Sequence, residues 1–118
     1  MAQAFTKKLL SGSTNGKGIL ISATASTGNT IHTAVSGTSS LDEIYLYGTN
    51  TSASAVVVNV EWGEANTSPS TNTILTIPPK TGRYVIADGR LLQNGLVVTI
   101  FASVTNTVVI DGFVNAIV

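Results

Sequence analysis

Residues 55–62 have the sequence AVVVNVEW, in which every second residue from Val56 onward is large and apolar and the polar residues Asn59 and Glu61 stand between them. Successive side chains of an extended chain point to opposite sides, so one side of this segment is almost entirely apolar. The apolar side consists of Val56, Val58, Val60 and Trp62. A period of two over this length is typical of a half-buried β-strand. The segment therefore predicts a strand with these four residues in the core and Glu61 on the opposite side.

Similar runs recur along the whole chain, separated by Gly, Asn, Ser, Thr and Pro. Val, Ile and Thr make up 40 of the 118 residues, and these side chains favour strands. No stretch has helical periodicity long enough to compete. Besides 55–62, we expect strands at 17–26, 29–35, 41–48, 71–77, 82–87, 96–103 and 107–118. The chain therefore predicts an all-β fold, a single β-sandwich of about eight strands that is jelly-roll-like or a Greek key.

Glycine-containing segments predict the turns of this sandwich. Residues 27–29, TGN, predict a short hairpin between the strands 17–26 and 29–35. Residues 88–90, DGR, predict a turn, so we expect the strand 82–87 to end before Asp88. Gly112 lies inside the last predicted strand, which indicates a bulge or a close approach of another backbone.

Residues 1–16 lack the alternation of a strand, and we expect them to form an arm outside the sandwich domain of residues 17–118. The arm carries candidate partner-binding residues: Phe5, Lys7, Lys8, Leu9 and Leu10. Such a segment has too little apolar surface to fold alone but can become ordered on a partner, either a neighbouring subunit or the larger assembly to which the protein attaches. We expect its three large apolar side chains to be buried there, with the two lysines meeting acidic groups at the rim.

The charge balance excludes several kinds of partner. Six Lys plus Arg balance six Asp plus Glu, and only 10% of the residues are charged, against about 25% in an ordinary soluble domain. We therefore expect no nucleic-acid partner, and the short apolar runs predict no membrane span and no signal peptide. The surface is neutral, and the unpaired edges of the predicted sheets are expected to lack the lysines that usually protect such edges, so we expect self-association.

Candidate chemistry depends on very few residues. His32 is the only histidine, and its place opposite Ile31 on a predicted strand favours an exposed or cross-strand packing role over catalysis. The carboxylate pairs lack the spacing of a calcium loop, and no set of zinc ligands is present. These pairs, Asp42 with Glu43 and Glu61 with Glu64, are expected to be solvated groups at strand ends. We therefore expect no catalytic residue, no cofactor and no metal.

The C-terminal half combines several motifs in a fixed order. They are Trp62-Gly63 after a valine-rich strand, Ile77-Pro78, Gly82 and Val85 followed by Asp88-Gly89, Leu92 with Gly95, and a closing segment 106–117. This combination resembles small virion proteins of tailed bacteriophages, of the capsid decoration or cement type. The resemblance implies a jelly-roll-like sandwich on the capsid exterior that binds the major capsid protein and itself, often as a trimer. Residues 1–55 carry no such motif.

Two other binding functions stay open. A carbohydrate-binding module for adhesion needs exposed aromatic rings, for which Tyr45, Tyr47 and Tyr84 are the candidates. A tyrosine whose ring points to the core cannot stack on a sugar and is excluded from this role. A tail or head-fibre component of the virion is the other alternative, and an enzyme is the least supported class.

Overall fold

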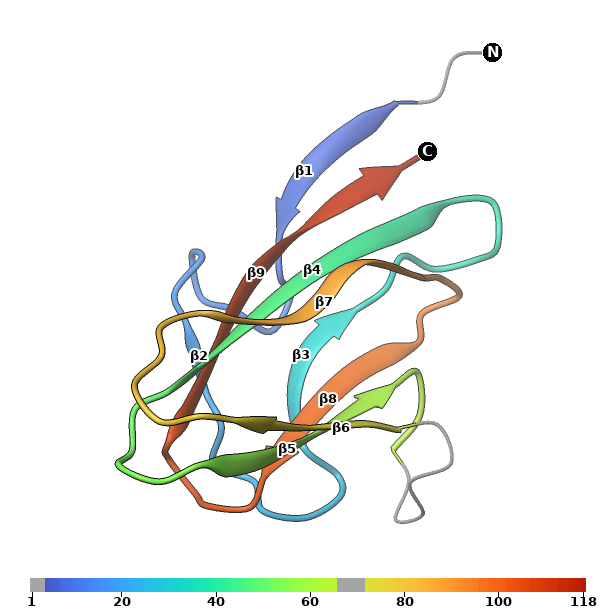
Figure 1. The fold of residues 1–118 in the computed structure, drawn as a ribbon. Helices are drawn as coiled ribbons and strands as arrows, with labels where there is room; N and C mark the ends of the chain where they lie inside the picture. The colour runs from blue at the N-terminus through green and yellow to red at the C-terminus, as the bar shows by residue number, and fades with distance from the viewer. Residues whose placement is uncertain (1–3, 66–71) are drawn as a thin grey trace.

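Two antiparallel sheets form the molecule in this computed structural model, which describes residues 4–65 and 72–118 (Figure 1). Sheet A contains β1 (Phe5–Leu9), β2 (Ile19–Leu20), β4 (Leu41–Asn50), β7 (Tyr84–Leu92) and β9 (Val108–Ile117). Sheet B contains β3 (Asn29–Thr33), β5 (Val56–Trp62), β6 (Asn72–Ile77) and β8 (Val97–Ala102). The strand orders are β1-β9-β4-β7, with β2 also on β9, and β3-β8-β5-β6. Within the described residues no helix is long and apolar enough to cross a membrane.

The strands pair in a nested order along the chain. β5 pairs with β6, β4 with β7, β3 with β8, and β1 and β2 with the last strand, β9. This nesting arises when one long antiparallel hairpin is rolled over two sheets, which is the jelly-roll arrangement. The predicted all-β sandwich is therefore confirmed.

β1 and β2 share one strand position, because both lie along the same edge of β9. β1 pairs with residues 113–117 and β2 with Val109 and Ile110. Residues 10–18 between them leave the sheet, bury Leu10 in the core, and donate a hydrogen bond from the Gly12 N–H to the Ile31 carbonyl of β3. The expectation of an arm without strand structure is thus wrong for residues 5–9, and Leu10 belongs to the core.

Two predicted turns lie elsewhere. Residues 27–29 do not form a hairpin, because β2 lies in sheet A and β3 in sheet B. Residues 88–90 lie inside β7, where Gly89 is an extra residue between the partners of Ile44 and Tyr45. This bulge has a φ of 87° at Gly89, which glycine adopts without steric cost, so the strand continues through it. The predicted start of β6 at Thr71 lies outside the described residues.

The core lies between the sheets and includes the predicted face of β5. Val56, Val58 and Val60 are fully buried, whereas Trp62 is partly buried and packs against the edge of the core. The other buried apolar residues come from the strands of both sheets and from the segments that connect them: Leu10, Ile21, Ile31, Ala34, Ile44, Leu46, Ile77, Ala87, Leu92, Val98, Ile100, Ala102, Val108, Ile110 and Val114. Each large side chain of this kind contributes about 1.5–3 kcal/mol when it leaves water.

Candidate functional site

The side chains of sheet A that point away from sheet B form an outer surface, here called the sheet A face. Along β4, buried residues alternate with half-exposed ones, and the strand register extends this outward set to its neighbours. The face includes Phe5, Lys7 and Leu9 of β1, Leu20 of β2, Leu41, Glu43, Tyr45 and Tyr47 of β4, Val85, Asp88 and Leu91 of β7, and Asp111, Phe113, Asn115 and Ile117 of β9.

Large apolar side chains dominate this face. Several are exposed, with Phe5 at 67% and Leu91 at 51%, and Leu9, Leu20 and Val85 in the same range. The outer surface of sheet B is more polar, since its exposed apolar residues on β5 and β6 are interspersed with Asn and Thr. An apolar patch that spans several strands is typical of an interaction site.

An aromatic stack crosses the middle of the sheet A face. Tyr45 of β4 and Phe113 of β9 are directly opposite, with ring centroids 4.7 Å apart and planes at 12°. On the β1 side, the Lys7 ammonium lies over the Phe113 ring, 5.0 Å from its centroid. On the β7 side, Gly89 faces the tyrosine, since a Cβ added there would lie 3.2 Å from the Tyr45 hydroxyl. The stack therefore connects all four strands in the order β1-β9-β4-β7.

A second cation covers the neighbouring aromatic ring. The Arg83 guanidinium lies 4.1 Å from the centroid of Tyr47 and its Nε is 3.4 Å from Oδ1 of Asp111. Both charged side chains are largely exposed, so this ion pair contributes little to stability. Arg83 therefore holds the Tyr47 ring in place, and its ion pair with Asp111 neutralises both charges at this point of the face.

Glu43 links polar groups of the sheet A face. Its Oε1 accepts hydrogen bonds from the Tyr45 hydroxyl at 2.9 Å and from the Asn115 amide at 3.0 Å. The Asn115 and Tyr45 hydrogen bonds favour the carboxylate and hold the pKa of Glu43 below its usual value. The same bond to Glu43 raises the pKa of the Tyr45 phenol.

The predicted partner-binding residues separate into three groups. Phe5, Lys7 and Leu9 lie on the sheet A face and are exposed. Lys8 is exposed on the opposite side of β1, and Leu10 is 2% exposed in the core. The expected lack of edge lysines is wrong at β1, because this free edge carries both Lys7 and Lys8.

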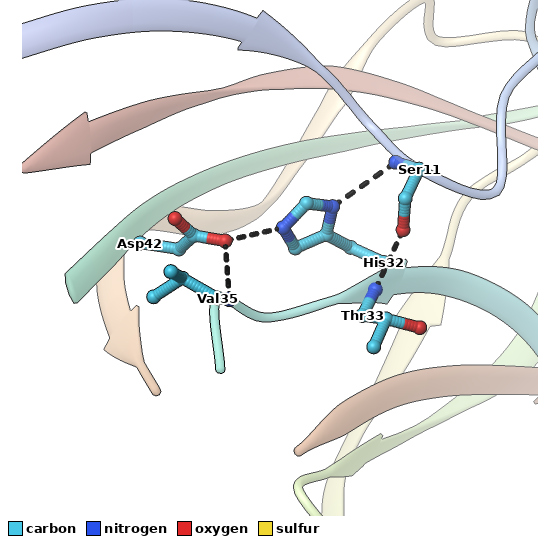
Figure 2. A network of polar contacts seen from close by, with 5 residues as sticks. All are labelled: Ser11, His32, Thr33, Val35 and Asp42. Carbon is cyan, nitrogen blue, oxygen red and sulfur yellow. Dashed lines mark hydrogen bonds and ion pairs between the residues drawn. The ribbon is translucent and has the colours of Figure 1, made fainter. Parts of the chain in front are cut away.

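A polar network around the buried side chains of His32 and Asp42 lies at the opposite side of sheet A, where residues 10–12 meet β3 and β4 (Figure 2). The His32 Nε2 is 2.7 Å from Oδ2 of Asp42, and the His32 Nδ1 accepts the Ser11 backbone N–H at 3.0 Å. Oδ2 of Asp42 also accepts the Val35 N–H at 3.1 Å, and the Ser11 hydroxyl accepts the Thr33 N–H at 2.7 Å. His32 therefore carries its proton on Nε2 and donates it to Asp42.

The exposed position, one of the two alternatives expected for His32, is wrong, because His32 is 4% exposed; its ring packs inside the protein and is hydrogen-bonded at both nitrogens. A register shift between Thr30 and His32 turns His32 inward together with Ile31. The Ser11 hydroxyl makes its hydrogen bond to Thr33 rather than to the imidazole. Ser/His/Asp catalysis needs a hydroxyl bonded to the histidine base, so this arrangement is built to hold three segments together.

Two carboxylates expected in solvent are buried. Asp42 is in the network of Figure 2, and Glu61 is 0% exposed. Glu61 accepts hydrogen bonds from the Ser26 hydroxyl at 2.5 Å, the Gly28 N–H at 2.9 Å and the Thr99 hydroxyl at 2.7 Å. The prediction failed because the segment 26–28 folds over the outer side of β5 and supplies donors there. Glu64 is exposed, and Glu43 is half-buried.

Trp62 closes the edge between the two sheets. The Arg90 guanidinium of β7 lies 4.0 Å from the centroid of the Trp62 ring and donates a hydrogen bond to the Thr73 hydroxyl of β6 at 3.1 Å. Burial lowers the pKa of Arg90. The indole therefore has a structural contact on each side, the core on one and Arg90 on the other.

The residues that the structure describes form no pocket and bring together no group of three metal-ligating side chains. Comparison with known protein families, with curated proteins and with solved structures gives no match. The sheet A face is therefore the candidate functional site on its own geometry.

Proposed function

We propose that the protein is a non-enzymatic structural component of a tailed-bacteriophage virion, a capsid decoration or cement protein that binds and stabilises the major capsid protein lattice. It acts on the capsid exterior through protein contacts made by the sheet A face. The observation that carries this proposal is the row of exposed apolar side chains on that face, from Phe5 on β1 to Leu91 on β7.

Physical arguments support a role within an assembly. Leaving large apolar side chains in water forgoes about 1.5–3 kcal/mol each, which contact with a neighbour recovers. The chain has zero formal charge, so long-range repulsion does not keep copies or partners apart. The jelly roll is an architecture of viral shell proteins and of lectins, and the C-terminal motifs resemble the former.

The test begins with mass spectrometry of virions purified from the source phage. A decoration protein is expected at a copy number near that of the major capsid protein. A low copy number would instead support a tail or head-fibre component. The chain's absence from virions would overturn the proposal.

Binding to capsids that lack the protein then tests the face. Leu91→Lys and Val85→Lys place charges on the sheet A face and should reduce occupancy, whereas Val57→Lys and Ile74→Lys on sheet B are matched controls. Equal occupancy for all four variants would show that another surface binds the shell.

A carbohydrate-binding module is the second candidate, because Tyr45 and Tyr47 lie on the outward side of β4 as sugar stacking requires. Neighbouring groups cover both tyrosine rings, which leaves little ring surface for a sugar. Tyr45 lies between Phe113 and Gly89, and Arg83 covers Tyr47. Glycan-array binding that is lost in Tyr47→Ala would favour this candidate, and an empty array would count against it.

A further inference from the structure

We propose that the sheet A face binds a second copy of this chain, face to face, about a two-fold axis parallel to the strands. The inference rests on the proposed use of this face for protein contacts: it names a second copy as the occupant in solution, which must leave before the face binds the capsid. It is carried by the distribution of charge across the face and by the area that the face offers.

Two charges that form no ion pair within the described part of the chain lie at opposite edges of the face. Arg83 pairs with Asp111, whereas the Glu43 carboxylate in the middle of the face accepts hydrogen bonds from two neutral groups, Tyr45 and Asn115, and keeps its charge. Lys7 on β1, by contrast, has only the Phe113 ring as a partner, and Asp88 on β7 is exposed; neither forms an ion pair within the described part of the chain. The β1 edge is thus positive and the β7 edge negative.

A two-fold axis parallel to the strands exchanges the edges of the sheet. β1 of one copy then faces β7 of the other, and β9 faces β4, because the strand order is β1-β9-β4-β7. Lys7 of each copy then lies at the same edge of the interface as Asp88 of the other copy. The two-fold symmetry gives two such Lys7–Asp88 contacts. The rings of Tyr45 and Phe113 meet their counterparts in the centre.

The alternative face-to-face arrangement, with the axis across the strands, is disfavoured. It places β1 of one copy against β1 of the other, so Lys7 and Asp88 each approach a like charge. Like charges facing each other across an interface suppress that arrangement, which makes the charge pattern a selector of orientation. An isologous contact of this kind closes at two copies.

The area is sufficient for a weak but specific dimer. Four strands spaced about 4.8 Å apart and ten residues of about 3.3 Å each give about 600 Å² per copy. The total of about 1,200 Å² is at the lower limit of stable interfaces, which predicts dissociation in the micromolar range. The face also supplies the apolar centre and charged rim that such interfaces have.

Charge exchange provides the test, by sedimentation velocity of the full chain between about 1 and 200 µM, a range that brackets a micromolar dimer. The wild type should dimerise. Lys7→Glu and Asp88→Lys should each weaken dimerisation about tenfold, since each change makes two repulsive contacts, and the double variant should restore it. Both sites are exposed, so circular dichroism should show an unchanged fold. Ile74→Lys, on sheet B, is the control and should dimerise like the wild type.

Three results would overturn the inference: a wild type that stays monomeric, a trimer, or a double variant weaker than both single variants. These outcomes are distinct from failure of the proposed function. A dimer formed by a chain that is absent from virions would keep this contact and reject the capsid role. A chain that is found in virions but stays monomeric in solution would keep the capsid role and reject the dimer contact.

Discussion

The ring of Tyr45 stacks on the ring of Phe113 across β4 and β9, with centroids 4.7 Å apart, and this pair determines which residues fit around it. On one side of Tyr45 the β7 backbone approaches the ring at Gly89. Behind the pair, a Cβ at Gly112 would overlap the Tyr45 carbonyl oxygen. The predicted close approach at Gly112 is therefore confirmed, and the register of β4 on β9 is continuous there, without a bulge.

Gly112→Ala should destabilise the protein by about 3 kcal/mol, because the added methyl group forces β4 and β9 apart. Gly37→Ala is the control, since Gly37 has a φ of 77° but no atom near its Cβ position, and it should cost about 1 kcal/mol. Urea unfolding measures both. Equal costs for the two variants would show that the contact with Tyr45 relaxes easily.

The phenol of Tyr45 should ionise at higher pH than an ordinary tyrosine, because its hydroxyl donates to Glu43 and the neighbouring carboxylates disfavour the phenolate. Glu43→Gln removes that charge and should lower the pKa of Tyr45 toward its usual value. Ultraviolet difference titration of the three tyrosines follows this, with Tyr45→Phe to assign the signal. Identical titration curves for the wild type and Glu43→Gln would contradict the hydrogen bond.

Leu10→Ala should lower stability by about 2–5 kcal/mol, because Leu10 fills the core between the sheets. Leu9→Ala, one residue earlier and exposed, should change stability by less than about 0.5 kcal/mol. Thermal unfolding by circular dichroism compares the two. If both variants melt like the wild type, residues 1–16 are an arm after all.

Removing one member of the buried pair His32 and Asp42 should cost about 3 kcal/mol, because the remaining group loses a partner inside the protein. In Asp42→Ala the Val35 N–H also loses its acceptor. The double variant His32→Ala/Asp42→Ala should be more stable than the sum of the single effects predicts, by about 1–3 kcal/mol of coupling. Denaturant unfolding of the four proteins measures this, and strict additivity would show that the two side chains act independently.

Much of the fold was predictable because alternation and turn residues are local properties of the chain. The predicted strand 55–62 coincides with β5, and its apolar side enters the core, since burial of one side of a strand follows from its period of two. The predicted strand 107–118 contains β9 for the same reason. The prediction failed at Gly89, where a bulge lets one strand continue through residues that are typical of a turn.

The candidate site was predictable only in part. Phe5, Lys7 and Leu9 were expected to meet a partner, but nothing in residues 1–16 indicates that β1 pairs with β9 and aligns them with Phe113 and Tyr45. The alternation in β4 did place Tyr45 and Tyr47 opposite Ile44 and Leu46. The assembly of one continuous face required the order of four strands, which only long-range pairing establishes.

The sequence by itself determined the all-β class, the apolar side of β5 and the low, balanced charge, because composition and period need no partner. Only the tertiary structure decided that Leu10, Asp42 and Glu61 are buried. The two-residue period of a strand determines on which side of the strand a side chain lies. Whether that side is exposed to solvent depends on segments far away in the chain. Ser26 covers Glu61 from 35 positions earlier, and Ser11 reaches His32 across 21 positions.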